Sequence, residues 1–287
     1  MLRAYLAIGL CTVFWAGNFT AGKIATRSGV DPYLIAGLRA VATAALFYAL
    51  LPDRRLSRAD VRALLPLALA GIAVNHVCFA VGIFHTTPSH SAVIHALIPV
   101  FVSVLAWLLL KERLGPAAVA GLVLAVGGAL AVVLGATADE RRGTLLGDVL
   151  TAMGILGFSV YTVLGRGVLQ TMGGLKAIAW SFVLSIPVML PTTAVGLVRQ
   201  DWARVPWEGW VAFAYMWVFA SVVCYRLHVY ALARLKAGQV AAFTALQPAI
   251  GISIAVAAGQ DRLSLPLVAG AVLAVIGIIL VQRNPEL

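Results

Sequence analysis

Ten long apolar runs, separated by short charged connectors, leave this chain of 287 residues very few ways to fold. A helix needs about 20 residues to cross the hydrocarbon of a bilayer, so ten crossings take roughly 200 residues. Only 11% of the residues are charged, whereas a soluble domain carries about 25%. The pattern predicts an all-α integral membrane protein with ten transmembrane helices, and it excludes a soluble enzyme or a disordered chain.

The runs end at charged residues, proline or glycine, and each has the length of a membrane-spanning helix. In the first half of the chain they are Tyr5–Gly22, Tyr33–Leu51, Leu64–Phe84, Ser91–Leu110 and Ala117–Leu134. In the second half they are Asp148–Leu164, Ala177–Leu197, Trp210–Tyr230, Val240–Gly259 and Leu265–Val281.

The distribution of lysine and arginine predicts the orientation of the chain. If the N-terminus is cytoplasmic, twelve of these residues fall in inside segments and seven in outside segments. Because cytoplasmic connectors carry the excess of positive charge, we expect both termini in the cytoplasm. The net charge of +10 therefore reflects the orientation of the chain in the membrane. The expected partner is the lipid bilayer, and no nucleic acid is expected.

The chain also contains an internal repeat. A shift of 149 residues aligns His90–Gly128 with Gln239–Gly277 at fifteen identities in 39 positions, without a gap. This predicts two five-span halves, residues 1–138 and 139–287. An odd number of spans makes the second half enter the membrane from the opposite side, so the fold class is two inverted five-helix repeats. Such repeats are typical of transporters that work by alternating access.

Several short motifs fit this arrangement. They are Trp15-Ala-Gly-Asn-Phe19 with Lys23, Asp31-Pro32 leading to Arg39, Pro99 with Lys111-Glu-Arg-Leu114, and Pro248 with Asp261-Arg-Leu263. Together they resemble the drug/metabolite transporter superfamily in its ten-span, EamA-like branch. The resemblance implies export of amino acids or other small metabolites from bacteria across the inner membrane. It also implies a cavity between spans one to four and six to nine, with spans five and ten peripheral.

No aspartate or glutamate lies in the interior of any predicted span. A carboxylate is the usual group for binding a proton or a cation in hydrocarbon. Its absence argues against a proton-coupled exporter of cationic drugs. His76 is the only histidine predicted deep in a span, so we expect transport without coupling, or with a weak pH dependence through that residue.

Polar residues within spans are the candidates for substrate binding, because they cost free energy unless they pair or face water. His76 is flanked by Asn75 and has Phe79 on its own helix face, and Asn18 lies one turn from Trp15. Each polar side chain has a structural alternative, a hydrogen bond to a backbone carbonyl or between helices. Arg39 could meet the carboxylate of a substrate, or it could have a structural role by pairing with Asp31 or with backbone carbonyls, and we favour the structural role.

The repeat extends this list of candidates. Tyr225 matches His76 at the shift of 149 residues, and Tyr161 matches Asn18 at a shift of 143. His95 and Gln247 come just before the paired prolines. The predicted substrate-binding residues are therefore Trp15, Asn18, Asn75, His76, Phe79, His95, Tyr161, Tyr225 and Gln247. The prolines, Pro99 and Pro248, are predicted hinges or static kinks.

Other patterns predict little chemistry. His85, His90 and His95 recur every five residues, a spacing that rotates a helix by about 500° and excludes a shared metal site; the first two are expected in a loop. The sequence carries none of the common hydrolase or phosphate-binding motifs, so we expect no cofactor and no enzymatic activity. The glycine spacing repeated at 121–128 and 270–277 indicates close helix packing or a homodimer through the fifth and tenth spans.

The predicted function is export of small polar or zwitterionic metabolites, with amino acids favoured, by alternating access of the two halves. A proton-coupled exporter of drugs or cations is the nearest alternative. A lipid scramblase or a membrane scaffold is the alternative from another class. A polar central cavity would favour transport, a groove open to lipid would favour scrambling, and a dry packed bundle would favour a scaffold.

Overall fold

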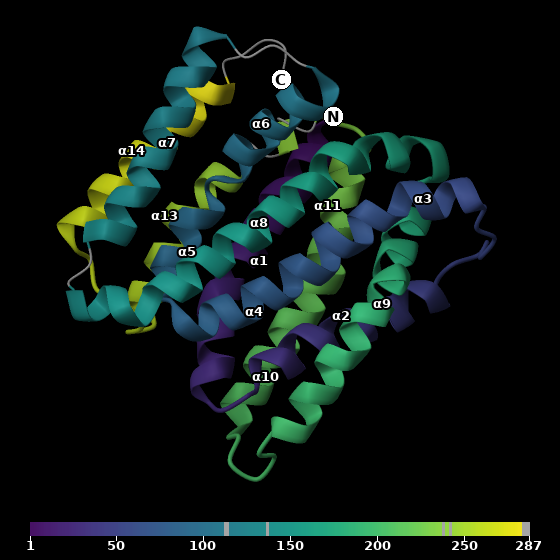
Figure 1. Ribbon diagram of the computed structural model, residues 1–287, viewed down its shortest axis with the longest axis horizontal. Coiled ribbons are helices and arrows are strands. Elements are labelled where there is room, and N and C mark those ends of the chain that lie inside the picture. Colours follow the sequence, from purple (N-terminus) through teal and green to yellow (C-terminus); the bar gives the residue numbers. More distant parts are fainter. Residues whose placement is uncertain (112–114, 136–137, 237–238, 241–242, 283–287) are drawn as a thin grey trace.

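The computed structural model is helical, without strands in the part of the chain that it describes (Figure 1). It describes all residues except 112–114, 136–137, 237–238, 241–242 and 283–287. For residues 135, 138–143, 244–245 and 282 it describes the backbone only. The motif residues Glu112, Arg113 and Leu114 and the side chains at the predicted boundary between the halves lie outside this set.

The helices follow the predicted runs but extend beyond most of them. The first half contains α1 (Leu2–Arg27), α2 (Pro32–Ala49), α3 (Arg58–Pro66), η1 (Leu67–Val74), α4 (Asn75–His85), α5 (Pro88–His95), α6 (Ile98–Leu110) and α7 (Pro116–Gly135). The second half contains α8 (Ala138–Met172), α9 (Gly174–Arg199), α10 (Trp207–Tyr215), η2 (Met216–Val223), α11 (Cys224–Leu232), η3 (Phe243–Leu246), α13 (Gln247–Ala257) and α14 (Leu265–Gln282).

Eight helical segments within the described residues are long and apolar enough to cross a membrane. Two shorter apolar helices, α13 and α14, coincide with the ninth and tenth predicted spans. The structure therefore supports a multi-pass helical membrane protein. The count of ten crossings and the inverted relation of the halves stay predictions.

Irregular helix geometry recurs at equivalent positions of the two halves. The third span contains the π-helical segment η1 and the eighth span contains η2, and Leu67 and Met216 at their starts are 149 residues apart. The fourth span breaks between α5 and α6, and the ninth changes from η3 to α13 at the corresponding point. Pro99 and Pro248 lie in the first turns of α6 and α13, where a proline needs no hydrogen-bonded N–H.

Connector residues start the helices with polar caps. Asp31 accepts hydrogen bonds from the backbone N–H groups of Tyr33 and Leu34, and Pro32 follows it as the first residue of α2. Thr87 caps α5 in the same way, by accepting from the N–H of His90. These caps satisfy N–H groups that have no partner inside the helix.

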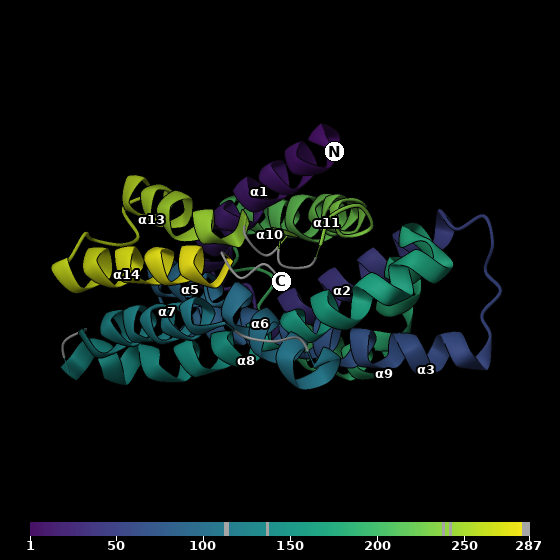
Figure 2. The same ribbon diagram turned by 90° about the horizontal axis from the view of Figure 1, so that it is seen from above.

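Equivalent helices of the two halves pack on each other, α2 on α9 and α7 on α14. The second pair lies at one edge of the molecule (Figure 1). Figure 2 shows α13, α14 and α1 on one side of the molecule and α7, α8 and α3 on the other. The peripheral position of α7 and α14 agrees with the arrangement that the family resemblance implies.

Glycines bring α7 and α14 into backbone contact. A Cβ atom on Gly128 would lie 2.5 Å from the backbone of Gly270 and Ala274, and one on Gly121 would lie 2.5 Å from the carbonyl oxygen of Gly277. The repeated glycine spacing therefore serves close packing within one chain, because only residues without a side chain allow this approach. A homodimer through these spans stays a prediction and would have to use their outward faces.

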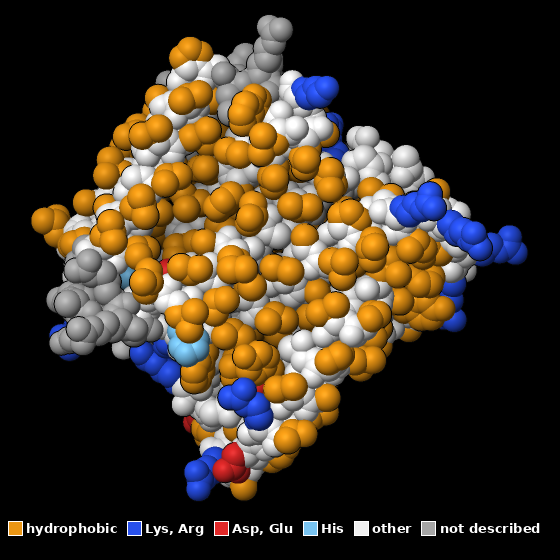
Figure 3. Space-filling model, viewed as in Figure 1, with side chains coloured by type: hydrophobic (Ala, Val, Ile, Leu, Met, Phe, Trp, Pro, Cys, Tyr) orange, Lys and Arg blue, Asp and Glu red, His pale blue; other side chains and the backbone are white. Residues whose placement is uncertain are grey.

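The outer surface is suited to lipid. Large hydrophobic side chains are exposed along α7 and α9, among them Val123, Leu134, Leu190 and Val198. Figure 3 shows hydrophobic side chains spread over one face of the molecule, with Lys and Arg at its margins. Apolar surface of this extent is typical of a protein in contact with hydrocarbon rather than with water.

Candidate functional site

A cavity lies among helices of both halves. Its wall is built mainly from residues that the sequence singled out. Eight of the nine predicted substrate-binding residues line it: Trp15, Asn18, Asn75, His76, Phe79, His95, Tyr225 and Gln247. The other lining residues are Phe19, Arg39, Ile98, Ile155, Phe158 and Ala220. Their part in substrate binding stays a prediction.

His76 and Tyr225 meet in this cavity, with ring centroids 5.9 Å apart. His76 Nδ1 lies 3.0 Å from the carbonyl oxygen of Ile72. A carbonyl only accepts, so Nδ1 carries the hydrogen, and in the neutral ring Nε2 is an acceptor. Nε2 is buried and has no hydrogen-bond partner among the described residues. His76 therefore bonds its own helix, as the structural alternative required, and keeps an unpaired acceptor on a residue of the cavity wall.

Two amide side chains have free oxygens at the same cavity. Asn18 Oδ1 and Gln247 Oε1 are buried and lack hydrogen-bond partners in the part of the chain that the structure describes. Asn75 differs, because its Nδ2 donates to the carbonyl oxygen of Gly154 at 3.0 Å and thus joins α4 to α8. An unpaired buried acceptor costs free energy, so water or a ligand with N–H or O–H groups is the natural partner of the free oxygens.

Aromatic rings form the apolar part of the wall. Trp15 donates from Nε1 to the carbonyl oxygen of Ala220 at 3.0 Å, which fixes its ring between α1 and η2. His95 donates from Nδ1 to the carbonyl oxygen of Ser91 and packs against Phe19 and Phe79, at centroid distances of 4.8 and 5.7 Å. The flat rings leave space for an apolar side chain of a ligand.

Tyr161 does not line the cavity. It is fully buried behind the wall, stacked on Phe158 and in edge contact with Tyr225. Its position supports the wall rather than contacting a ligand, since the two rings in front of it separate it from the cavity. His228, which no motif indicated, packs in the same group against Trp15 at 5.4 Å. The sequence could have indicated His228, because it lies three residues after Tyr225 and therefore on the same face of the helix.

Arg39 bonds a different partner from those considered in the sequence. Asp31, one of the expected structural partners, instead caps α2 and lies 3.4 Å from the guanidinium of Arg199. Arg39 is 4% exposed and donates from Nε and Nη2 to Ser221 Oγ, at 3.1 and 2.9 Å. Ser221 in turn donates to the carbonyl oxygen of Met216, five residues earlier in η2.

The charged side chain at the described cavity wall is a cation. Arg39 lines the cavity, and none of the ion pairs among the described residues involves Arg39. No acidic side chain lines the described cavity wall. A buried guanidinium without a carboxylate is costly and favours a ligand that brings one. The signal in the sequence was an arginine within a predicted span and no acid in the interior of the predicted spans to pair with it.

The histidines do not assemble a metal site in the described part of the chain, where no three His, Cys, Asp or Glu side chains come close enough to share an ion. His85 and His90, expected in a loop, are instead the last residue of α4 and the third residue of α5. The prediction of a loop was wrong because the connector between these helices is only Thr86 and Thr87.

Known proteins with this sequence pattern are transporters. The chain is 24% identical to an uncharacterized transporter of Archaeoglobus fulgidus, over 99% of this chain and 100% of the relative. It is 29% identical to a probable terminal-alkyne amino-acid exporter of Streptantibioticus cattleyicolor, over 98% and 94%. One solved crystal structure superposes with a TM-score of 0.66 at 18% identity, covering 99% of this chain and 98% of the other.

The family match covers both halves of the chain. The EamA-like transporter family matches residues 2–134 and again residues 145–283. This confirms the resemblance drawn from the motifs at Trp15, Arg39, Pro99 and Pro248. The chain therefore belongs to the EamA-like family of the drug/metabolite transporter superfamily and is a multi-pass membrane transporter.

Proposed function

We propose that this transporter exports amino acids or closely related zwitterionic metabolites by alternating access. The observation that carries the proposal is the cavity wall, which holds the buried cation of Arg39 together with the free acceptors His76 Nε2, Asn18 Oδ1 and Gln247 Oε1. A carboxylate is the complement of the guanidinium, and an ammonium group is the complement of neutral acceptors. An α-amino acid carries both groups on one carbon.

The relative from Streptantibioticus cattleyicolor supports the substrate class, since its name describes an amino-acid exporter. The matched irregularities of the third and eighth spans, and of the fourth and ninth, support two equivalent halves. Two such units in opposite orientation exchange conformations about a central site, which is the basis of alternating access. Transport, and no enzymatic reaction, is the activity that these features favour.

The alternatives fit this cavity less well. An exporter of cationic drugs needs an acid to attract its substrate, whereas the described lining of this cavity carries a cation and no acid. A scaffold needs no cavity, and the unpaired acceptors at its wall would only destabilise it. A scramblase needs a polar groove along which lipid headgroups move, and the polar groups here gather at a central site instead.

Counterflow in proteoliposomes tests the substrate class. Vesicles are loaded with one unlabelled compound, and uptake of radiolabelled amino acids is measured against matched amines that lack only the carboxylate. We expect exchange with amino acids, and at least about tenfold slower exchange with the amines, because the contact with Arg39 is lost. Exchange of cationic drugs alone, or movement of fluorescent lipid alone, would replace the proposal with the corresponding alternative.

We further propose a bacterial inner-membrane location with both termini in the cytoplasm, from the distribution of Lys and Arg. Cysteines introduced as Arg58→Cys and Arg204→Cys test the orientation in a background without native cysteines. Both positions are exposed, and they lie at opposite ends of the bundle. In intact cells an impermeant maleimide is expected to label position 204 and to spare position 58. The reverse labelling would invert the topology.

A further inference from the structure

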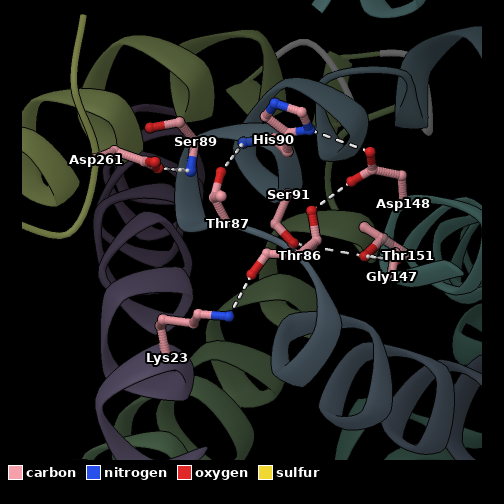
Figure 4. Close-up of polar contacts among 10 residues, drawn as sticks. All are labelled: Lys23, Thr86, Thr87, Ser89, His90, Ser91, Gly147, Asp148, Thr151 and Asp261. Carbon is pink, nitrogen blue, oxygen red and sulfur yellow. Dashed lines mark hydrogen bonds and ion pairs between the residues drawn. The ribbon is translucent and has the colours of Figure 1, made fainter. Parts of the chain in front are cut away.

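The connector between α4 and α5 is held from three directions by polar groups (Figure 4). Lys23 of α1 donates to the carbonyl oxygens of Ile83, Phe84 and Thr86, at 3.2, 3.1 and 2.6 Å. These three bonds use all the hydrogens of its ammonium group. They fix the last turn of α4, where unpaired carbonyls favour a cation.

The second half of the chain holds the other side of this connector. Asp148 of α8 accepts a hydrogen bond from the hydroxyl of Thr86 and lies 3.1 Å from His90 Nδ1. Asp261, in the turn between α13 and α14, accepts from the backbone N–H of Ser89 at 2.8 Å. Both carboxylates thus hold the beginning of α5 from across the boundary between the halves.

Asp148 is buried, which the sequence did not indicate. Its side chain is only 3% exposed, and that of His90 is 13% exposed. The expected span began at Asp148, but α8 begins ten residues earlier, so the carboxylate lies inside the helix and faces its neighbours. Gly147 lets α8 approach, because a Cβ atom there would lie 2.6 Å from the carbonyl oxygen of Gly82 and from the N–H of Thr86.

Among the described side chains, few other charges lie near this carboxylate. His90 is the titratable group in direct contact with it, and Lys23 is engaged with carbonyl oxygens. Neither α6 nor α7 carries a charged residue, and residues 139–142 of α8 lie outside the described side chains. The remaining titratable or charged groups at this end of α1, α4 and the turn before α14 are Arg27, His85, Asp261 and Arg262.

The helix held in this way leads directly to the cavity. α5 is only eight residues long, and it ends at His95, which lines the cavity. Two non-helical residues, Ala96 and Leu97, separate it from α6. The contacts of Asp148 thus hold the start of a short helix whose last residue belongs to the cavity wall.

We propose that the carboxylate of Asp148 holds α5 closed over this end of the cavity through Thr86 and His90, and that α5 moves away from this position when these contacts are lost. The carboxylate accepts from two donors at once, and hydrogen bonds to a charged acceptor are about twice as strong as neutral ones. This site is distinct from the substrate site at Arg39.

The first test reads the position of α5 without any substrate, so it does not depend on the substrate class proposed above. Val93, fully buried on α5, is replaced with cysteine in a full-length background without native cysteines. Maleimide labelling in nanodiscs is compared at one fixed pH with and without Asp148→Asn. We expect about tenfold faster labelling with Asp148→Asn, and a rate near that of the parent with Asp148→Glu.

An ion pair between a carboxylate and an ammonium group, at the other end of the third span, provides the matched control. Asp53 pairs with Lys176 at 2.8 Å, and the hydrogen bond from Lys176 lowers the pKa of Asp53 below its ordinary value. Asp53→Asn is expected to leave labelling of position 93 unchanged. Equal labelling with Asp148→Asn and with Asp53→Asn would overturn the proposal. If Asp148→Asn does not fold, His90→Ala must accelerate labelling, and an unchanged rate would again overturn the proposal.

The second test measures amino-acid exchange in proteoliposomes at one fixed pH. We expect Asp148→Asn to raise the exchange rate several-fold, because α5 is no longer held, whereas Asp53→Asn should keep the rate of the parent. A changed labelling rate without exchange of any amino acid would contradict the proposed substrate and support the role of Asp148, whereas an exchange rate unchanged by Asp148→Asn would refute that role.

Discussion

Replacing Arg39 with glutamine is expected to lower the apparent affinity for amino-acid substrates roughly 30-fold or more. Truncating one partner of a buried, hydrogen-bonded charge pair costs about 2–5 kcal/mol, and each 1.4 kcal/mol corresponds to a factor of about ten. Arg39→Lys should fall between the parent and Arg39→Gln, because an ammonium group cannot make the paired bonds of a planar guanidinium. The measurement is concentration-dependent counterflow with the purified variants.

The matched control is Arg226→Gln, which removes another arginine of the spans. Arg226 follows Tyr225 on α11, but its side chain is exposed and lines no part of the cavity. The Arg226→Gln variant should leave the apparent affinity for amino acids unchanged. The role assigned to Arg39 also requires that its variants discriminate less between an amino acid and the matched amine. An Arg39→Gln variant that kept the full preference for amino acids would exclude the guanidinium as the carboxylate partner.

Replacing Gly128 with valine is expected to destabilise the protein by about 3 kcal/mol or more. A Cβ atom there would lie 2.5 Å from the backbone nitrogen of Ala274, so α7 and α14 would have to separate. Overpacking of this kind typically costs 1–3 kcal/mol, and backbone atoms yield less than side chains. The expected drop in melting temperature is roughly 6–12 °C, measured by the loss of monodisperse protein in detergent.

The neighbouring residue provides a close control. Gly127 lies on the same helix, and a Cβ atom on it would meet nothing within 4 Å. Gly127→Val should therefore leave the melting temperature within a few degrees of the parent. Equal loss in both variants would show that valine harms α7 by itself and that the contact with α14 is not responsible.

Much of this architecture could be predicted because it depends on local pattern. Runs of about 20 apolar residues identify helices in a membrane without any knowledge of their neighbours. The repeat of 149 residues, found from identities such as Pro99 and Pro248, also relates the π-helical segments of the third and eighth spans. It placed His76 and Tyr225 together in the cavity, because equivalent residues of two similar halves approach a shared centre.

The positions of Arg39, Asp148 and Tyr161 could not be predicted in this way. Each of their helices is apolar around most of its circumference, so no polar face in the sequence shows which side meets a neighbour. Asp31 seemed the natural partner of Arg39 because it is near in sequence, yet Ser221, 182 residues away, accepts its hydrogen bonds. Tyr161 was matched to Asn18 by the weaker shift, and the rotation of α8 turns it behind Phe158.

The sequence by itself determined the helical membrane architecture, the two related halves and the family, since these depend on hydrophobicity and repeated residues along the chain. The tertiary structure alone decided which helix face meets which. It placed Gly128 against the backbone of α14, bonded Arg39 to Ser221, and buried Asp148 against Thr86 and His90. The reason is physical: contacts between apolar helices depend on their rotation and close packing, which a uniformly apolar sequence does not specify.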